Sequence, residues 1–405
     1  MIRGLALRQV ACHRRIGSIT SLPKLPVTIH PLGDGIMRRT IATGKRQNRL
    51  PAAYYRGGTS RAIMFRQDDL PKDHSKWDDI FLGTIGSPDS YGRQLDGMGG
   101  GISSLSKVCI TGLSERPDAD VDYTFVSIGI KNTNNDYSSN CGNMSAAVGP
   151  FAVDSGLIAV PAGANEATVR IHNTNTGKII EAVFPVTEGE ADASGDFAID
   201  GVSGTAARVT LNFLDPAGSR TGKLFPTGEK VQTIAGFRAS CIDAGNPCVF
   251  VHAQTLGVPG DLTPQQIEDE PGLLGRLEAI RCEAAVKMGL ATSVESVPGS
   301  VPKIGIVSSP EDSAPNTIVV RAMSVGQPHK AIPVTVAMAA AAAVNVEGTT
   351  VNECLVGTTE DNQVTVRHAS GTLDVGAKFD SEGSLVAATV FRTARRLMDG
   401  SVYWK

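Results

Sequence analysis

The chain has 405 residues, of which 41% are hydrophobic, 20% are charged and 5% are aromatic. This composition excludes a disordered chain and predicts a globular protein of two domains or more, rich in strands and turns. No run of about 18 apolar residues occurs, so no membrane-spanning helix and no membrane partner are expected.

Residues 1–49 form a basic leader, because the first fifty residues hold ten Lys and Arg against a single acid, Asp34. An arginine-rich, acid-poor start is typical of an organellar transit peptide and predicts the mitochondrial matrix. A disordered basic arm on a cytoplasmic protein is the alternative interpretation. The remainder of the chain is acidic, which argues against nucleic acid as a partner.

The seven cysteines are odd in number and include no CxxC pair, so free thiols in a reducing compartment are expected. The sequence contains no HExxH motif, Cys/His cluster or EF-hand pattern, and we therefore predict no metal site.

The first elements form a hairpin, a helix and a loop that ends at a lysine. Residues 54–65 predict a strand, a tight turn and a second strand, with Ser60 just after two glycines. A helix is expected over residues 74–82. Glycines and serines over residues 96–106 then predict a loop, and Lys107 begins a strand. A lysine is normally a solvated surface charge, but burial near a helix N-terminus would lower its pKa toward that of a useful base.

A polar turn carries Cys141 after a strand predicted over residues 122–130. A small-residue, helix-compatible run leads from Gly142 through Val153. Free backbone N–H groups at the start of a helix stabilise a thiolate and also bind carboxylates. A free cysteine is usually a buried apolar residue, but the neighbours of Cys141 are polar. We therefore predict that Cys141 is a proton-transfer group beside an anion site.

The second part of the chain repeats this order of elements. A β-meander is predicted over residues 166–215, and two helices are predicted over residues 262–290. In the repeated order of elements, Asn246 corresponds to Ser60, and Lys303 corresponds to Lys107. The apolar run 331–344 predicts a helix buried on all sides, like the run after Cys141.

We interpret the repeat as a duplicated domain, with coincidence among common strand–helix patterns as the alternative. The predicted fold class is α+β, with two halves that each wrap a curved, mostly antiparallel sheet around a central buried helix. The active site would lie in the cleft between them. The predicted domains are residues 50–200, joined by the segment 385–405, and residues 201–384.

Six motifs with specific order and spacing resemble the PrpF family over about residues 50–405. They are RGGTS at 56–60, DGMGGGISSLSK at 96–107, NCGN at 140–143, DAGNP at 243–247, GQPHKA at 326–331 and RTARRLMDG at 392–400. That family contains 2-methylaconitate isomerases, aconitate Δ-isomerases, methylitaconate isomerases and 4-oxalomesaconate tautomerases. The resemblance implies the diaminopimelate-epimerase-like fold, in which two pseudo-symmetric halves each surround a helix.

The resemblance further implies that Lys107 and Cys141 carry the proton transfers, with Ser60 close by. Epimerases of this fold place one cysteine on each central helix, whereas the second helix here begins near Gln327-Pro328-His329 and offers none. A two-thiol stereoinversion is therefore not expected, although His329 or Lys330 could substitute for the second thiol. We predict a cofactor-independent isomerase that moves a C=C bond in an aconitate-type tricarboxylate.

Several further side chains and backbone groups are candidates for binding the substrate carboxylates, although turn chemistry or loop flexibility would also explain them. They are Ser60, Gly99, Gly100, Asn143, Asn246, Ser324, His329 and Lys330. Arg93 is an additional candidate counter-ion, and Lys303 is interpreted as either structural or anion-binding.

Two substrates compete within this prediction: 2-methylaconitate of the methylcitrate pathway, and cis- or trans-aconitate. Related unsaturated polycarboxylates remain alternatives, namely alkyl-citrate-derived acids, methylitaconate and oxalomesaconate. Other classes are a non-catalytic accessory of an aconitase-like dehydratase and an amino-acid epimerase. A homodimer formed through sheet edges is expected.

Overall fold

The computed structural model describes residues 47–359 and 362–405. The predicted leader lies outside the described residues except for its last three positions, where the first strand already begins at Asn48. None of the helices in the described part of the chain is long and apolar enough to cross a membrane.

The first group of strands forms a closed ring. Its members are β1 (Asn48–Gly57), β2 (Ser60–Arg66), β3 (Lys107–Leu113), β4 (Val121–Ile128), β6 (Glu166–Asn173), β7 (Lys178–Thr187), β11 (Arg208–Leu214) and β20 (Leu385–Trp404). The parallel pairs are β2–β3 and β4–β6, and the other neighbours pair antiparallel, with β20 closing the ring against β1. Short strands lie beside them, namely β5 (Asn135–Asp136), β8 (Glu190–Ala191), β9 (Phe197–Ala198) and β10 (Thr205–Ala206).

The second group of strands repeats the same series of pairings. It consists of β12 (Gln232–Ile234), β13 (Phe237–Asp243), β14 (Pro247–His252), β15 (Lys303–Ser308), β16 (Thr317–Ser324), β17 (Gln327–Pro328), β18 (Gln363–His368) and β19 (Gly371–Phe379). Here β14–β15 and β16–β18 are the parallel pairs, and they correspond to β2–β3 and β4–β6. The sheet is therefore mixed, and antiparallel pairs predominate among the described strands.

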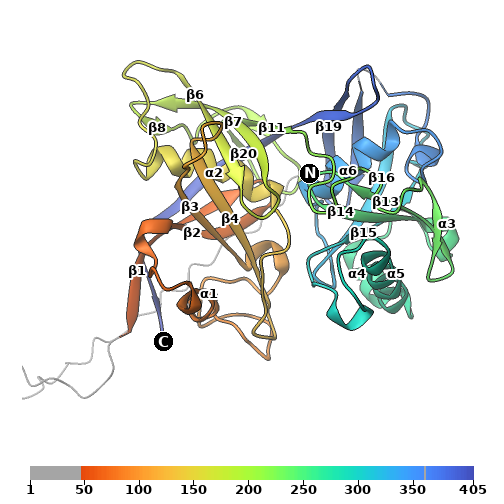
Figure 1. Ribbon diagram of the computed structural model, residues 1–405, viewed down its shortest axis with the longest axis horizontal. Helices are drawn as coiled ribbons and strands as arrows, with labels where there is room; N and C mark the ends of the chain where they lie inside the picture. Colours follow the sequence, from red (N-terminus) through yellow and green to blue (C-terminus); the bar gives the residue numbers. More distant parts are fainter. Residues whose placement is uncertain (1–46, 360–361) are drawn as a thin grey trace, which may run out of the picture. The chain divides into compact units, whose positions relative to one another are not determined.

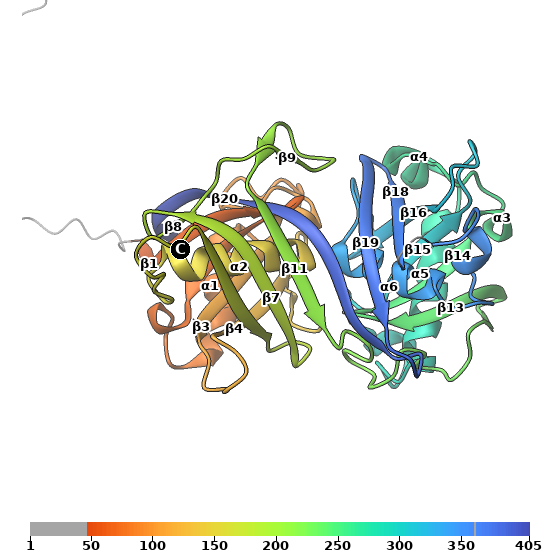
Figure 2. The ribbon, with the colours of Figure 1, turned by 90° about the horizontal axis from the view of Figure 1, so that it is seen from above.

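Strand β20 belongs to both groups. Its start pairs with β19, its middle with β11, and its end with β1. Figure 2 shows this long strand running from β19 to the side of β1 and β8. The predicted segment 385–405 therefore pairs with the first group of strands, while its first residues also continue the second group.

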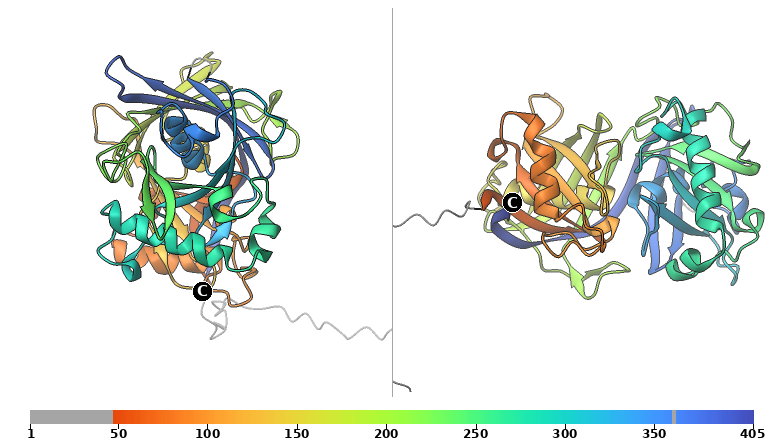
Figure 3. Two further views of the ribbon diagram at one scale, coloured as in Figure 1. Left: turned by 90° about the vertical axis from the view of Figure 1, so that its right-hand side faces the viewer. Right: turned by 90° about the horizontal axis from the view of Figure 1, so that it is seen from below.

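Each group of strands surrounds one buried helix, α2 (Gly142–Asp154) or α6 (Val334–Val344), as Figure 1 and the left view of Figure 3 show. All eleven residues of α6 are buried, and so are residues 142–153 of α2. Ala, Gly and Val dominate both helices, so the strands can pack closely on every side. The two helices contribute to one continuous hydrophobic core.

Helix α6 begins three residues later than the sequence predicts. Pro333 occupies its N-cap position, and its extended backbone begins the helix at Val334 instead of Ala331. A proline lacks the N–H that a preceding turn would use, and it disfavours helical geometry in the residue before it. His329 and Lys330 therefore lie before the helix rather than in its first turn.

The outer helices are α1 (Trp77–Ile85), α3 (Ala253–Leu256), α4 (Pro264–Asp269) and α5 (Leu273–Lys287). The sequence places α1 a few residues too early, because a separate 3₁₀ turn occupies residues 74–76. Helix α4 begins as predicted, with the Thr263 hydroxyl accepting from Gln266 N and Pro264 in the first turn.

Candidate active site

One small cavity, hereafter the site cavity, brings together most of the predicted site residues. Six of them line it: Ser60, Lys107, Cys141, Asn143, Ser324 and His329. The cavity volume is about 20 Å³, which is room for about one water molecule. A polycarboxylate can therefore enter only if the walls move apart.

Lys107 is the first residue of β3 and is only 7% exposed. Its amine lies 4.9 Å from the centre of the Phe125 ring, and it forms no ion pair with any described residue. Burying an ammonium without a counter-ion is costly, and a cation–π contact offsets only part of that cost. The position therefore favours an anionic ligand.

Cys141 is the N-cap residue of α2, and the first helical residues, Gly142 and Asn143, also line the site cavity. A Cβ atom on Gly142 would lie 2.8 Å from Cβ of Val334, the first residue of α6. The N-termini of both central helices therefore meet at this point. Unpaired N–H groups and the positive ends of two helix dipoles favour carboxylate binding here.

Asn143 connects the first hairpin to the segment before α6. Its Oδ1 accepts from Thr59 N at 3.4 Å, and its Nδ2 donates to Ile332 O at 3.5 Å. Gly58 has a φ of +50°, and a Cβ atom there would collide with Asn143 Oδ1. The glycine therefore permits the tight turn that brings Ser60, which is 1% exposed, to the site cavity.

His329 lines the site cavity as an uncharged side chain. Burial and the nearby positive charge of Lys107 lower the pKa of its imidazole to about 3. Its Nδ1 accepts from Ala331 N at 3.1 Å, so the neutral ring carries its proton on Nε2. His329 can therefore donate a hydrogen bond to a substrate oxygen but cannot act as a cationic counter-ion.

Lys330 is exposed and does not line the site cavity. It lies with His329, Gln327 and Ser103 on a neighbouring open hollow of about 510 Å³. Ser103 N donates to Gln327 Oε1 at 3.3 Å, so the glycine–serine loop contacts the second half of the molecule at this hollow. The role predicted for Lys330 as a carboxylate ligand inside the site does not match this position.

Gly99 and Gly100 also fail to line the site cavity. Gly99 N donates to Ile85 O at 3.0 Å, and a Cβ atom on Gly100 would press against Leu105. In this structure these glycines permit close packing of the loop, and neither lines the site cavity. Gln94 was not predicted; it is buried, and its Oε1 accepts from Gly101 N at 2.8 Å and so supports the loop before Lys107.

Asn246 is fully buried and is not part of the cavity wall. Its Oδ1 accepts from Asn140 N at 3.0 Å, while its Nδ2 donates to Asn140 O at 2.7 Å and to Thr335 Oγ1 at 3.2 Å. The amide therefore holds the chain beside Cys141 against α6. This places it in a positioning role rather than in the substrate contact that the sequence suggested.

We expect the Asn246→Ala variant to lose about 2–4 kcal/mol of unfolding free energy, because it leaves the buried N–H and C=O groups of Asn140 without partners. Urea unfolding followed by circular dichroism measures this loss. Asn48→Ala, at an exposed strand end, is the matched control. A loss below about 0.5 kcal/mol for Asn246→Ala would contradict this role.

Lys303 lines the site cavity from the second half together with Ser300, although the sequence did not place it among the main site candidates. Its place in the repeat, equivalent to that of Lys107, was the available signal. Ser127, Ser139 and Thr335 also line the cavity and were not predicted. Single serines and threonines have no distinguishing sequence pattern, so only the assembled fold identifies them.

The remaining described cysteines lie outside the site cavity. Cys109, Cys248 and Cys354 are buried, and burial raises the pKa of each thiol. Cys282 is only partly buried, because it lies on the half-exposed helix α5 beside Glu278. In the described part of the chain, no group of three or more His, Cys, Asp or Glu side chains is arranged to hold a metal ion.

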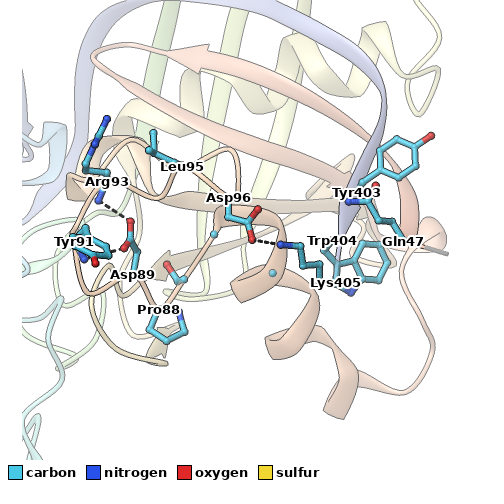
Figure 4. Close-up of a pocket in the computed structure, with 13 residues that line it drawn as sticks. Gln47, Pro88, Asp89, Tyr91, Arg93, Leu95, Asp96, Tyr403, Trp404 and Lys405 are labelled. Atoms are coloured by element: carbon cyan, nitrogen blue, oxygen red, sulfur yellow. Dashed lines mark hydrogen bonds and ion pairs between the residues drawn. The ribbon is translucent and has the colours of Figure 1, made fainter. Parts of the chain in front are cut away.

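A larger cavity of about 560 Å³ lies between the loop after α1 and the end of β20 (Figure 4). Arg93, the additional counter-ion candidate, lines this cavity and is exposed, so it is separate from the site cavity. Asp89 accepts hydrogen bonds from the backbone of Tyr91 and Arg93, and Lys405 pairs with Asp96 at 2.7 Å.

Known proteins resemble the chain over nearly all of its described length. A family model described as PrpF protein matches residues 47–405. A protein named 3-methylitaconate isomerase from Eubacterium barkeri is 40% identical over 375 residues, covering 88% of this chain and 97% of that protein. A protein named 2-methyl-aconitate isomerase from Cupriavidus necator is 40% identical over 386 residues, covering 88% and 97%.

Solved structures show the same fold. A structure of methylitaconate-delta-isomerase matches with a TM-score of 0.71 and 38% identity, covering 88% of this chain and 96% of that one. A hydroxyproline epimerase from Agrobacterium vitis matches with a TM-score of 0.53 at 14% identity, covering 88% and 92%. The fold is therefore epimerase-like and dominated by its sheet.

Proposed function

The chain belongs to the PrpF family, and we propose that it is an isomerase that moves a C=C bond within an unsaturated polycarboxylate by proton transfer. The observation that carries the proposal is the site cavity itself. Lys107 and Cys141 both line it, and the N-termini of α2 and α6 meet there. The site thus contains two groups that can transfer protons, together with a site that can bind anions.

The proposed reaction breaks one allylic C–H bond and forms another at the far end of the double bond. One of the two groups, acting as a base, removes the proton next to a carboxylate, and the electron pair moves into a dienolate. The other group then donates a proton to the opposite carbon, so the double bond shifts and no charge is gained or lost. Helix N-termini stabilise the extra negative charge of the dienolate.

The substrate we propose is an aconitate-type tricarboxylate, either 2-methylaconitate or cis- or trans-aconitate. Relatives named 2-methyl-aconitate isomerase and 3-methylitaconate isomerase support this class. One cavity is lined by three side chains that can donate hydrogen bonds to carboxylates, namely Lys107, Lys303 and His329. This arrangement suits a substrate with several carboxylates.

We further propose that the protein arose by duplication, with domains over residues 50–200 plus 385–405 and over residues 201–384. The repeated series of strand pairings and the two buried helices support this proposal. The mitochondrial matrix remains our proposed location, and it depends on the leader alone.

The experiment that tests the function is NMR in deuterated water with a panel of aconitate, 2-methylaconitate, methylitaconate and oxalomesaconate. We expect double-bond migration in at least one of these acids, with deuterium entering at one defined carbon. The absence of both migration and deuterium uptake from every acid in the panel would overturn the proposed function.

A further inference from the structure

Lys303 occupies the same place in the second half of the molecule that Lys107 occupies in the first. Each lysine begins a strand, β15 or β3, that pairs parallel with one neighbour and antiparallel with the other. Each is 7% exposed, and both line the site cavity. Two buried ammonium groups therefore approach one small space from different halves of the chain.

The Lys303 amine has few partners among the described residues. It donates one hydrogen bond, to Ser300 O at 2.9 Å, and forms no ion pair. An ammonium carries three N–H donors, so two remain for a ligand. Burial lowers the pKa of Lys303, and the charge of Lys107 adds to this effect. Burial therefore disfavours the charged form of Lys303, and a bound anion would stabilise it.

Asp136 acts on Lys303 through its charge but forms no ion pair with it, because the Asp136 oxygens have other partners. Its Oδ2 accepts from Ser300 N at 2.9 Å, and its Oδ1 accepts from the backbone and the hydroxyl of Ser138. Arg281 donates to Pro298 O at 2.8 Å and to Val301 O at 3.2 Å. The segment that carries the Ser300 carbonyl is thus held from both sides, and Lys303 is fixed before a ligand arrives.

We propose that Lys303 binds a non-reacting carboxylate of the substrate and thereby selects acids with two or more separated carboxylates over monocarboxylates. This inference rests on the proposed function, since it concerns the same cavity. Lys107 remains at the reacting carbon beside Cys141, while Lys303 holds a second carboxylate from the other half. The two lysines together require a ligand with at least two separated negative charges, because either charge left alone in the cavity is disfavoured.

The test compares binding of a saturated tricarboxylate, propane-1,2,3-tricarboxylate, with binding of the monocarboxylate butanoate by isothermal titration calorimetry. We expect Lys303→Met to weaken tricarboxylate binding about 10- to 100-fold, as expected for loss of a charged hydrogen bond, and to change butanoate binding less than about 3-fold. Lys303→Gln is the second variant in case Lys303→Met does not fold. Lys223→Met, at an exposed lysine, is the matched control.

An equal loss of affinity for both acids, or no loss for either, would overturn the proposal. With a turned-over substrate, we expect KM to rise and kcat to change little. A fall of kcat accompanied by loss of solvent deuterium exchange would instead make Lys303 a proton-transfer group and would overturn the selective role. Binding is measured without turnover, so a wild-type protein inactive on the whole acid panel would refute the proposed function separately.

Discussion

The Lys107→Met variant is expected to reduce kcat by about 10²- to 10⁴-fold, the contribution typical of a positioned acid or base. The change keeps an unbranched side chain that is one heavy atom shorter and removes its exchangeable protons. Because Lys107 is buried and forms no ion pair with a described residue, methionine also removes an uncompensated charge. We therefore expect no loss of folding stability, and the thermal midpoint should be equal to or higher than that of the wild type.

The measurement is deuterium NMR of each half-reaction, with circular dichroism to check folding. If Lys107 is one end of the proton relay, the variant will lose exchange at one carbon and keep slow exchange at the other. Lys107→Arg should not restore turnover, because a guanidinium does not release its proton in proteins. Lys223→Met serves as the control, and wild-type turnover in folded Lys107→Met would contradict the assignment.

Much of the architecture around the site can be predicted from local sequence signals. The strand that begins at Lys107 follows a loop of glycines and serines, and the helix after Cys141 begins at Gly142, as predicted. These boundaries depend on turn chemistry and on runs of small or β-branched residues, which act over a few positions. The repeat also gives Lys303 its place, although one sequence does not reveal how deeply it is buried.

The misplaced residues depend on contacts between segments far apart in the chain. Gly99 and Gly100 resemble an anion-binding loop, but the loop turns its glycines toward Ile85 and Leu105. Asn246 resembles Ser60 in order, yet its amide is used by the backbone of Asn140, more than a hundred residues away. Neither outcome follows from local pattern, since tertiary packing decides which polar groups face a cavity.

The N-caps of the two central helices differ in chemistry although their surroundings repeat. Cys141 caps α2, whereas Pro333 caps α6 and has no side-chain donor or acceptor. His329 lies close by but is neutral, with a pKa of about 3, so it cannot replace a second thiol as an acid near neutral pH. The first half alone therefore contributes a thiol to the site cavity, whereas both halves contribute groups that can bind carboxylates. This asymmetry favours a double-bond shift over inversion at a single carbon.

Cys141→Ala is expected to lower kcat by about 10²- to 10⁴-fold with little change in the affinity for propane-1,2,3-tricarboxylate. The thiol is partly exposed at the mouth of α2, while backbone N–H groups of the helix, which the substitution keeps, contribute to carboxylate binding. Cys141→Ser should retain slightly more activity than Cys141→Ala, because a hydroxyl can still relay a proton but is a much weaker acid than a thiol.

The same thiol can be examined without mutation of the site. In a Cys282→Ser background, Cys141 is the one partly exposed cysteine among residues 47–359 and 362–405. We expect iodoacetamide to modify Cys141 and abolish turnover in parallel, with peptide mapping by mass spectrometry to identify the labelled cysteine. Bound propane-1,2,3-tricarboxylate should slow both events equally, because it fills the site cavity that Cys141 lines. If Cys141 were fully alkylated while turnover persisted, it could not be a proton-transfer group, and the pairing with Lys107 would be wrong.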